Sequence, residues 1–361
     1  MRITSDLKSK RKISDEKYIL RCIQLAKNGL GTTFPNPMVG CVLVHNNKII
    51  GEGYTSAYGG AHAEVNAINS VTNKSLLENT TLYVTLEPCS HYGKTPPCAD
   101  LILKYKIPRI VIGTMDPNEK VSGRGIKKLR AEGCEVLVGV CEQESKNHHK
   151  RFLRFHQQKR PYIILKWAQT SDGFIAPDKG LRSNDPKPYW ITNKNSRQLV
   201  HKWRSEEQAI LVGTNTILED NPKLDVRKWL GSSPTRMVLD KNLKIDANYH
   251  ILDTSIKTIV FTEIKDRSKY TKGVIYEVVD FSNELLQRLC EIGYKHSILS
   301  ILIEGGSKTI QSFIEKNLWD EARVFTGTSQ FGNGLKAPRL SAKQVSSLQI
   351  GTDTLNIYKN D

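Results

Sequence analysis

The sequence predicts two consecutive α/β domains, each built on a sheet flanked by helices. Three observations support this prediction. The chain has 361 residues, more than one hydrophobic core usually serves, so two domains are expected. Short apolar segments of strand character alternate with segments of helical periodicity along the whole chain. Seven cysteines at scattered spacings argue against a disulfide framework and for a core held by apolar packing.

The first half alternates regularly between helical and strand patterns. Ser14 is the expected N-cap of a first helix that runs to about Gly29. Strands at Val39–Val44 and Lys48–Tyr54 flank a hairpin turn at 45–47. The pattern then alternates between helix and strand in the segments His62–Val71, Thr81–Leu86, Cys98–Lys106, Arg109–Thr114, Gly125–Glu132 and Glu135–Gly139. This order implies a mixed sheet sandwiched between helices.

A charged segment, Cys141–Gln158, separates the two halves. Phe152 and Phe155 lie three positions apart, which predicts a connecting helix that stops before Pro161. We therefore expect a first domain over residues 14–145, a connecting helix or linker over 146–159, and a second domain over 160–361.

The second half is a further series of short apolar strands with helices between them, and its tail is expected to form an antiparallel hairpin. The expected strands are Tyr162–Ala168, Ala209–Gly213, Thr235–Leu239, Thr258–Phe261, Val274–Val278, Leu299–Ile303, Ala322–Thr326 and Leu348–Tyr358. The expected helices are Asn195–Ser205, Ser282–Gly293 and Ser307–Lys316. The pattern predicts a second α/β domain.

The net charge of +16 is spread over the chain. Residues 1–150 carry 21 Lys and Arg against 14 Asp and Glu, an excess of +7, and the remainder carries 32 against 23, an excess of +9. A small cluster at Lys8, Lys10, Arg11 and Lys12 is expected to be a solvated, frayed N-terminus. Such a diffuse positive field suits phosphorylated small molecules as well as polynucleotides.

The sequence offers no sign of export or of a membrane span. Residues 1–17 are polar and basic, without the apolar core of a secretory signal. No apolar run approaches the length needed to span a bilayer. A cytoplasmic location with reduced thiols and no membrane partner is therefore expected.

A histidine, a glutamate and two cysteines stand where strands meet helices in the first half. His62 and Glu64 open a helix, Cys89 ends a strand, and Cys98 opens the next helix. His62, Cys89 and Cys98 are a three-ligand set for zinc with a fourth position open for water, and a helix N-terminus favours the thiolate form of a cysteine. Zinc lowers the pKa of such a water from 15.7 to about 7, and Glu64 is placed to move its proton.

His-x-Glu followed by Pro-Cys and a further Cys is the pattern of zinc-dependent deaminases. A lone His-x-Glu is usually structural, so the weight of the prediction rests on the ordered combination of the four residues. The remaining cysteines lie in apolar segments, where small buried residues are the simpler interpretation. They are Cys22, Cys41, Cys134, Cys141 and Cys290.

The spacing of the two predicted cysteine ligands departs from the short Cys-x-x-Cys of nucleic-acid deaminases. Cys89 and Cys98 are nine positions apart, and the segment 90–97 between them is expected to form a rigid loop across the mouth of the site. The segment Thr85-Leu-Glu-Pro-Cys-Ser-His-Tyr-Gly-Lys-Thr-Pro-Pro-Cys98 resembles that of the bifunctional riboflavin biosynthesis deaminase–reductases. So do Pro35-Asn-Pro-Met-Val-Gly40 and Asp116-Pro-Asn118 with Gly123 and Gly125 after it.

The resemblance continues through the second half and omits only about the first dozen residues. The segments that carry it are Leu165–Gly173, Trp190–Thr192, Arg204, Gly213–Thr216, Asp220–Pro222, Leu224–Arg227 and Glu304–Ser307. Two segments depart from the family pattern. Residues 178–189 form a longer link than usual before Trp190, and Asn118 is followed by Glu119 where the family has proline.

The resemblance implies a cytidine-deaminase-like α/β/α sandwich followed by a dihydrofolate-reductase-like α/β domain that binds NADPH. In the first domain it implies substrate contacts by Asn36 and His91. In the second it implies substrate contacts by Arg204, Leu224, Arg227 and Glu304, and it places Lys166 and Asp220 nearest the hydride transfer. It further implies cofactor contacts by Gln169, Trp190, Thr216, Asp220, Gly306, Ser307, Lys308, Thr309, Ile310, Gln311 and Ser312.

Some of these residues also have an interpretation from pattern alone. A strand followed by Gly305-Gly306 and a helix is a geometry that admits a phosphate at a helix N-terminus, although it is not a GxGxxG fingerprint and a plain tight turn is more common. Arg204 and Arg227 suit a bidentate clamp on a phosphate, although a single arginine is usually a solvated charge.

The predicted function is therefore two steps of riboflavin biosynthesis. They are zinc-dependent deamination of a diaminopyrimidinone ribosyl phosphate and NADPH-dependent reduction of its ribosyl group to ribityl. One alternative is a nucleic-acid base deaminase with a C-terminal RNA-binding module, which predicts a short cysteine spacing, clustered basic charge and stacking aromatics. A second is a non-catalytic binding protein, against which the intact set of ligands and Glu64 weighs. The expected partner is a small phosphorylated pyrimidine and not a nucleic acid, and association of identical chains is left open.

Overall fold

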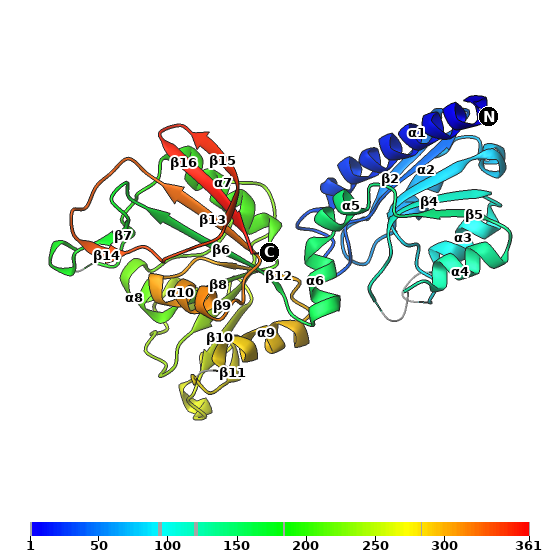
Figure 1. Ribbon diagram of the computed structural model, residues 1–361. Coiled ribbons are helices and arrows are strands. Elements are labelled where there is room, and N and C mark those ends of the chain that lie inside the picture. Colours follow the sequence, from blue (N-terminus) through cyan, green and yellow to red (C-terminus); the bar gives the residue numbers. More distant parts are fainter. Residues whose placement is uncertain (1, 93–95, 119–121, 183–184, 283, 361) are drawn as a thin grey trace. The chain divides into compact units, whose positions relative to one another are not determined.

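The computed structural model describes residues 2–92, 96–118, 122–182, 185–282 and 284–360. The chain divides into two compact units, residues 1–159 and 160–361, and each is described by itself (Figure 1). Both units are α/β, which confirms the predicted fold class. The segment 146–159, expected to connect the domains, lies in the first unit, where α5 (Glu142–His148) is followed by α6 (Lys150–Gln158).

The first unit is a five-stranded sheet with the order β2-β1-β3-β4-β5. Its strands are β1 (Gly40–His45), β2 (Lys48–Tyr54), β3 (Thr81–Leu86), β4 (Arg109–Thr114) and β5 (Glu135–Val138). β1 is antiparallel to β2 and β3, whereas β3, β4 and β5 run parallel, so the sheet is mixed as predicted. The central strands are apolar on both faces because helices cover both faces.

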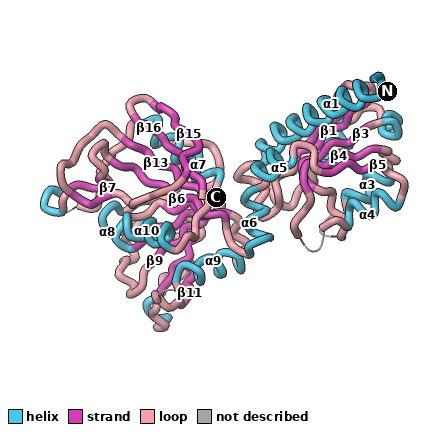
Figure 2. The backbone as a smooth tube through the Cα atoms, in the orientation of Figure 1, coloured by secondary structure: helices cyan, strands magenta, loops and turns pink. Residues whose placement is uncertain are grey.

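Helices cover this sheet on two sides (Figure 2). On one side α1 (Arg2–Ala26) packs Ile19 and Cys22 against Val42 and Tyr83, and α5 contacts α1. On the other side lie α3 (Cys98–Lys104) and α4 (Arg124–Ala131), with α2 (Ala63–Ser70) packed on β1 and β2. The sandwich brings the ends of β3, α2 and α3 together.

The first helix is longer than the sequence predicts. It begins at Arg2, so Ser14 lies inside the helix rather than at its N-cap, and the basic cluster at 8–12 is helical rather than frayed. Lysine and arginine are good helix formers, and no glycine or proline interrupts this stretch. Arg11 also forms an exposed ion pair with Glu135 at 3.0 Å, which ties this part of the helix to β5.

The second unit is built on a nine-stranded sheet with the order β11-β10-β9-β8-β12-β6-β13-β16-β15. The strands are β6 (Tyr162–Gln169), β8 (Ala209–Gly213), β9 (Thr235–Leu239), β10 (Thr258–Thr262), β11 (Ile275–Val278), β12 (Ser300–Ile303), β13 (Glu321–Thr326), β15 (Lys343–Ile350) and β16 (Asp353–Lys359). All neighbours are parallel except the β13–β16 and β15–β16 pairs. The predicted tail hairpin is present as β15 and β16, and β15 begins five residues earlier than expected.

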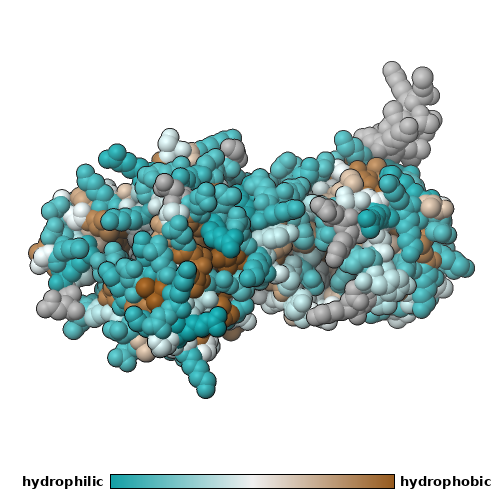
Figure 3. Space-filling model, turned by 90° about the horizontal axis from the view of Figure 1, so that it is seen from below, coloured by the Kyte–Doolittle hydropathy of each residue, from teal (hydrophilic) through white to brown (hydrophobic). Residues whose placement is uncertain are grey.

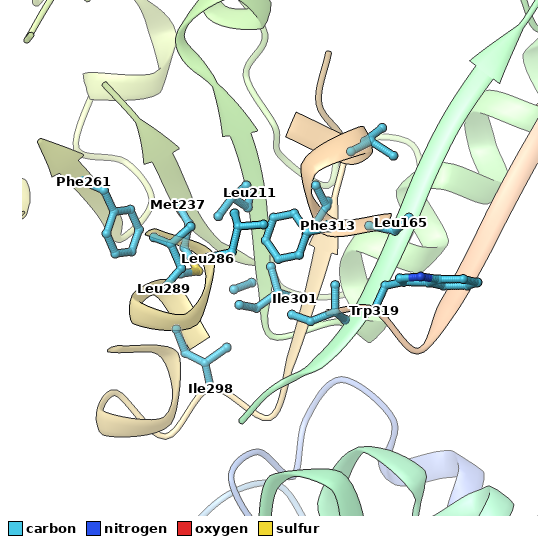
Figure 4. Packing of buried hydrophobic residues seen from close by; sticks show 14 of the residues in the cluster. Leu165, Leu211, Met237, Phe261, Leu286, Leu289, Ile298, Ile301, Phe313 and Trp319 are labelled. Carbon is cyan, nitrogen blue, oxygen red and sulfur yellow. The ribbon is translucent and has the colours of Figure 1, made fainter. Parts of the chain in front are cut away.

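The main core of this unit lies between the sheet and two helices, α9 (Leu285–Lys295) and α10 (Ser307–Glu315). Figure 4 shows Leu286 and Leu289 of α9 and Phe313 of α10 directed toward strand residues such as Leu211 and Met237. On the opposite face, Val200 and Trp203 of α7 (Lys194–Glu206) pack with Leu302 of β12. The sheet is therefore covered on both faces, as expected for parallel strands.

One helix and two paired strands of the second unit were not predicted. α8 (Thr214–Asp220) follows β8 directly, and β7 (Phe174–Pro177) pairs with β14 (Gly334–Lys336) in a separate two-stranded ribbon. Helix α8 is short, and an isolated two-stranded pair has too few residues for a clear periodic signal.

The surface is largely hydrophilic. In the view of Figure 3, hydrophobic residues gather on one area of the second unit, while the rest of that face is mostly polar. Over the described residues, no helix combines the length and the apolar character that crossing a membrane requires.

Candidate functional site

Three sulfur and nitrogen donors converge where β3 ends and two helices begin. His62 is the N-cap of α2, Cys98 is the first residue of α3, and Cys89 lies in the loop after β3. Their ligand atoms lie within 4.8 Å of one another, with 3.3 Å between the Cys98 Sγ and the His62 Nδ1 and 3.6 Å between the Cys89 Sγ and the same nitrogen. Two thiols and one imidazole nitrogen at this spacing fit zinc, because such a set leaves a fourth tetrahedral position open.

Local backbone contacts hold the two cysteines in place. The amide N–H of Cys98 donates to the Cys89 Sγ at 3.3 Å, and the Ala99 N–H donates to the Cys89 carbonyl oxygen at 3.0 Å. A hydrogen bond from the Cys98 thiol lowers the pKa of Cys89, and nearby His62 acts in the same direction. The first turn of α3 therefore favours a thiolate at Cys89, which is the form that binds a metal.

Glu64 lies beside this cluster in the first turn of α2. Its side chain is buried, with 4% exposure, and it hydrogen-bonds with Cys98. Burial raises the pKa of Glu64 to about 7. A carboxyl group poised near neutrality next to a metal-ligand set is suited to general acid–base work.

Glu87 is a residue of this region to which sequence reasoning gave no role. Its buried carboxylate accepts hydrogen bonds from three backbone N–H groups of the α4 start, those of Gly123 at 2.9 Å, Gly125 at 3.0 Å and Ile126 at 3.3 Å. It also accepts from the Asp116 N–H at 3.4 Å. Glu87 therefore fastens the segment after β4 to the Cys89 loop. In the sequence, Glu87 is marked only by its position at the end of an apolar strand, two residues before a predicted ligand.

Gly125 allows this close approach between α4 and the Cys89 loop. A Cβ at this position would lie 2.2 Å from the Pro88 carbonyl oxygen, a distance that real Cβ atoms essentially never show. Asp116 is also buried nearby, and burial together with the charge of Glu87 raises its pKa to about 7.

The two predicted substrate residues of this domain lie in loops. Asn36 is half-buried between α1 and β1, and its N–H donates to the Thr33 carbonyl oxygen at 2.9 Å. His91 is exposed in the loop that separates the two cysteines. The loop predicted to be rigid includes residues 93–95, which lie outside the described residues, as do Glu119 and its two successors.

In the second unit, three predicted residues form one buried ionic cluster at the carboxyl ends of β6 and β12. Glu304 follows β12 and receives two hydrogen bonds from Arg204 of α7, both at 2.9 Å. Lys166 of β6 lies 3.4 Å from the same carboxylate. Burial acts to raise the pKa of Glu304, but the charges of Arg204 and Lys166 outweigh it and lower the pKa to about 2.

The loop after α8 holds two further predicted residues, Leu224, which packs in a hydrophobic cluster, and Arg227, which lies near the ionic cluster. Leu224 is buried and has a positive φ of 51°. Arg227 pairs with Asp225, whose carbonyl oxygen accepts from Arg204 at 3.3 Å. His201 of α7 contacts the same carbonyl at 3.0 Å, and burial, with the charges of Arg204 and Arg227, lowers its pKa to about 4. Sequence reasoning missed His201 and Asp225, whose roles depend on a loop conformation that only the fold defines.

The predicted cofactor residues lie at the carboxyl ends of neighbouring strands β8 and β12. The Gly306 N–H donates to the Thr216 hydroxyl at 3.0 Å, which joins α8 to the start of α10. A Cβ on Gly213 would lie 2.9 Å from the Thr309 hydroxyl, so the two turns pack tightly. Ligands of open α/β sheets bind at this edge, outside the carboxyl ends of the strands.

The other members of the predicted cofactor set occupy different surroundings. Gln169 ends β6 and accepts from the Trp167 indole N–H at 2.9 Å, while Trp190 is exposed with Arg197 over its ring. Ile310 is fully buried in the core, so only its backbone is available to a ligand. On α10, Ser307 is half-buried and Lys308 exposed, the Gln311 side chain accepts from the Arg339 N–H, and the Ser312 hydroxyl donates to the Lys308 carbonyl.

Comparisons with known proteins match both units. Residues 12–114 match the family described as the cytidine and deoxycytidylate deaminase zinc-binding region, and residues 161–355 match the RibD C-terminal domain. The chain is 40% identical over 345 residues to the riboflavin biosynthesis protein RibD of Aquifex aeolicus, covering 93% of each protein. It is 32% identical over 338 residues to RibD of Escherichia coli, covering 89% of each.

Solved structures agree over nearly the whole chain. A deaminase/reductase from Thermotoga maritima has a TM-score of 0.88 and 37% identity, covering 97% of this chain and 99% of that one. RibD from Acinetobacter baumannii has a TM-score of 0.87 and 31% identity, covering 96% and 99%.

These matches decide between the alternatives for the C-terminal half. That half is a reductase domain and not an RNA-binding module, and the protein is an enzyme with a zinc-binding deaminase domain and an NADPH-using reductase domain. The chain belongs to the RibD family of bifunctional riboflavin biosynthesis proteins.

Proposed function

We propose that the chain deaminates 2,5-diamino-6-(5-phosphoribosylamino)pyrimidin-4(3H)-one and then reduces the ribosyl side chain of the resulting aminouracil to ribityl with NADPH. The Thermotoga maritima relative is named for this deaminase and this reductase. The observation that carries the proposal is the convergence of His62, Cys89 and Cys98 within 4.8 Å beside a buried Glu64.

For the first step, we assign His62, Cys89 and Cys98 as the zinc ligands and Glu64 as the proton carrier. When bound, zinc supplies Lewis-acid chemistry that makes a water molecule acidic near neutral pH. Glu64 would take one proton from that water and deliver it to the amine, which would leave as ammonia once the new C–O bond has formed. Asn36 and His91 are assigned to substrate binding from the loops beside the cluster.

For the second step, the residues of the ionic cluster hold the substrate. Arg204, Leu224, Arg227 and Glu304 are assigned to the phosphoribosyl substrate, since paired guanidinium groups suit a phosphate. Glu304 fixes the Arg204 guanidinium through two hydrogen bonds. Ion-paired in this way, the Arg204 side chain loses less conformational freedom when it binds a phosphate.

The reduction requires a hydride and a proton. NADPH supplies the hydride. Lys166 and Asp220 are assigned to the reacting end, and the Asp220 carboxyl is suited to give the proton. Burial and the charge of Glu219 raise its pKa to about 6, so part of it is protonated near neutral pH. The cofactor-binding residues are Gln169, Trp190, Thr216, Asp220, Gly306, Ser307, Lys308, Thr309, Ile310, Gln311 and Ser312.

We place the enzyme in the cytoplasm, acting on a small phosphorylated pyrimidine. The described cysteines are free, and the site needs Cys89 and Cys98 as thiolates, which a reducing compartment preserves.

A coupled assay tests both steps. The purified protein is supplied with the diaminopyrimidinone ribosyl phosphate and NADPH, and ammonia release and NADPH oxidation are followed together. We expect ammonia first and NADPH oxidation after it. Glu64→Gln should lose ammonia release by at least about a hundredfold while retaining zinc, because general acid–base groups contribute factors of this order.

The same variant separates the two steps. Supplied with the deaminated pyrimidine, Glu64→Gln should oxidise NADPH at the rate of the unaltered protein. Absence of NADPH oxidation by the unaltered protein with this substrate would remove the reductase assignment, and undiminished ammonia release by Glu64→Gln would remove the assignment of Glu64.

A further inference from the structure

The segment after β7 begins with a turn and a short helix at residues 178–181. Asp178 accepts a hydrogen bond from the Gly180 N–H at 2.9 Å, and a short 3-10 helix, η3 (Lys179–Leu181), follows. The Asn333 side chain donates to Asp178 at 3.4 Å, which links this segment to the loop before β14. The segment is therefore anchored to the β7–β14 ribbon.

Arg182 extends from the end of this segment to α8. Its Nε donates to the Pro177 carbonyl oxygen at 2.8 Å, and its Nη1 lies 2.6 Å from the Glu219 Oε2. The Arg182 side chain is only 13% exposed, although it comes from a loop. Burying a guanidinium is costly unless its partners are well placed, and here the Pro177 carbonyl oxygen and the Glu219 carboxylate, itself 43% exposed, are those partners.

Helix α8 carries residues assigned to the reductase reaction at both of its ends. Thr216 in its first turn accepts from the Gly306 N–H, and Asp220 is its last residue. Glu219, the partner of Arg182, directly precedes Asp220. A displacement of the last turn of α8 therefore moves the Asp220 carboxylate. The hydrogen bond between Gly306 and Thr216 fixes the first turn of the helix.

We propose that Arg182 is a positioning residue of the reductase site, which fixes the last turn of α8 through Glu219 and so places the Asp220 carboxylate for the reduction. The proposal rests on the proposed function of the second domain. It gives the 178–182 segment a role in the reductase site.

Electrostatics supports the same arrangement. The charged groups that act on Asp220 are Glu219, its neighbour on α8, and Arg182. Burial is the largest influence and raises the pKa of Asp220, Glu219 raises it further, and Arg182 lowers it. Removing the Arg182 charge should therefore raise this pKa, and removing the Glu219 charge should lower it.

The experiment measures kcat and KM for NADPH-dependent reduction of the deaminated pyrimidine across pH, in the full-length protein. If Asp220 gives the proton, activity falls as pH rises through its pKa. We expect Arg182→Met to lower kcat about tenfold, since misplacing a reacting group costs factors of ten to a hundred. The alkaline limb of the profile should move to higher pH in Arg182→Met and to lower pH in Glu219→Gln. Arg182→Lys, which keeps the charge, should leave the limb close to its original position.

The matched control is Arg288→Met, which removes an exposed Arg288–Glu291 ion pair of 2.8 Å on α9 of the same unit. It should leave kcat, KM and the pH profile unchanged, and ammonia release should be unchanged in every variant. If Arg182→Met does not fold, Arg182→Lys and Glu219→Gln decide.

The proposal is overturned if Arg182→Met keeps kcat within twofold of the unaltered protein. It is also overturned if the alkaline limbs of the pH profiles of Arg182→Met and Glu219→Gln do not move in opposite directions. If the unaltered protein itself shows no reduction, the proposed function fails, and the positioning role falls with it. If the unaltered protein reduces the substrate and the variants behave like it, only the positioning role of Arg182 is overturned.

Discussion

His149 is a titratable residue enclosed by the first unit. It lies at the junction of α5 and α6, is 1% exposed, and its Nε2 contacts the Thr85 hydroxyl at 3.0 Å. The neighbouring His148 contacts the Met38 carbonyl oxygen at 2.8 Å. Burial, together with the charge of His148, holds the pKa of His149 well below its usual range, so the folded protein keeps this imidazole neutral.

The stability that His149 contributes to the first unit should therefore fall in mild acid, whereas Glu64 and Asp116, whose raised pKa values let the folded unit bind protons there, act in the opposite direction. The unfolded chain protonates His149 below about pH 6.5 and the folded chain does not, so the free energy of unfolding decreases as pH falls, by at most about 1.4 kcal/mol per pH unit from this residue. Urea unfolding at about pH 7 and about pH 5.5 measures the slope. His149→Gln retains a polar partner for Thr85. As pH falls, it should lose less free energy of unfolding than the unaltered protein, and equal changes in the two proteins would contradict the assignment.

At the scale of residues, the sequence indicated the metal cluster but not its support. His62, Cys89 and Cys98 stand at strand and helix boundaries that periodicity reveals, so their convergence was predictable. Glu87 binds backbone N–H groups of the segment after β4, and such partners have no side-chain signature. The pairing of Arg204 with Glu304 spans 100 positions, and no local pattern marks it.

At the scale of elements, the start of α4 depends on the absence of one side chain. Gly125 lies against the Pro88 carbonyl oxygen, one residue before Cys89, and donates its N–H to Glu87. An alanine at this position requires the start of α4 and the Cys89 loop to move apart. The displacement would therefore affect the predicted metal ligand Cys89.

Gly125→Ala should therefore impair deamination selectively. We expect ammonia release to fall by about tenfold or more, because small displacements of reacting groups have effects of this size. Zinc content should fall with it, and NADPH oxidation with the deaminated pyrimidine should be unchanged. Lys127→Ala, an exposed change on the same helix, is the control. Full deaminase activity in Gly125→Ala would show that the contact is not limiting.

Elements with strong periodicity were predicted well, and the others were not. The buried central strands of both sheets were predicted directly from their apolar runs. The extended start of α1 was missed because a serine with two acids after it, at 14–16, imitates a helix beginning. Helix α8 and the β7–β14 ribbon were missed because each is short and depends on tertiary contacts, such as those of Gly306 and Arg182.

At the scale of the whole molecule, each unit has its own sheet, its own core and its own set of site residues. Such units are expected to unfold in separate transitions. The chain length predicted two domains, and the charged segment before Pro161 predicted where they divide.

Calorimetry should therefore resolve two transitions with different ligand responses. Chelation of zinc should lower the Tm of one, because a metal that binds only the folded state stabilises it. NADPH should raise the Tm of the other, because at a hundred times its Kd it stabilises the folded state by about 2.7 kcal/mol. His62→Ala should remove the Tm response to chelation and leave the Tm response to NADPH unchanged. A single transition that responds to both ligands would contradict the independence of the units.

The strand order of the second sheet has a consequence for how the chain is made on the ribosome. The first sheet is complete once residue 138 has been synthesised, so the deaminase unit is able to fold while translation continues. In the second sheet, β12 lies between β8 and β6, and β13 lies beyond β6. Strands β6 and β8 are made early, but β12, which lies between them, is complete only when residue 303 has been added. A message truncated before that point would yield a folded deaminase trailing exposed strand edges, a product prone to aggregation and degradation.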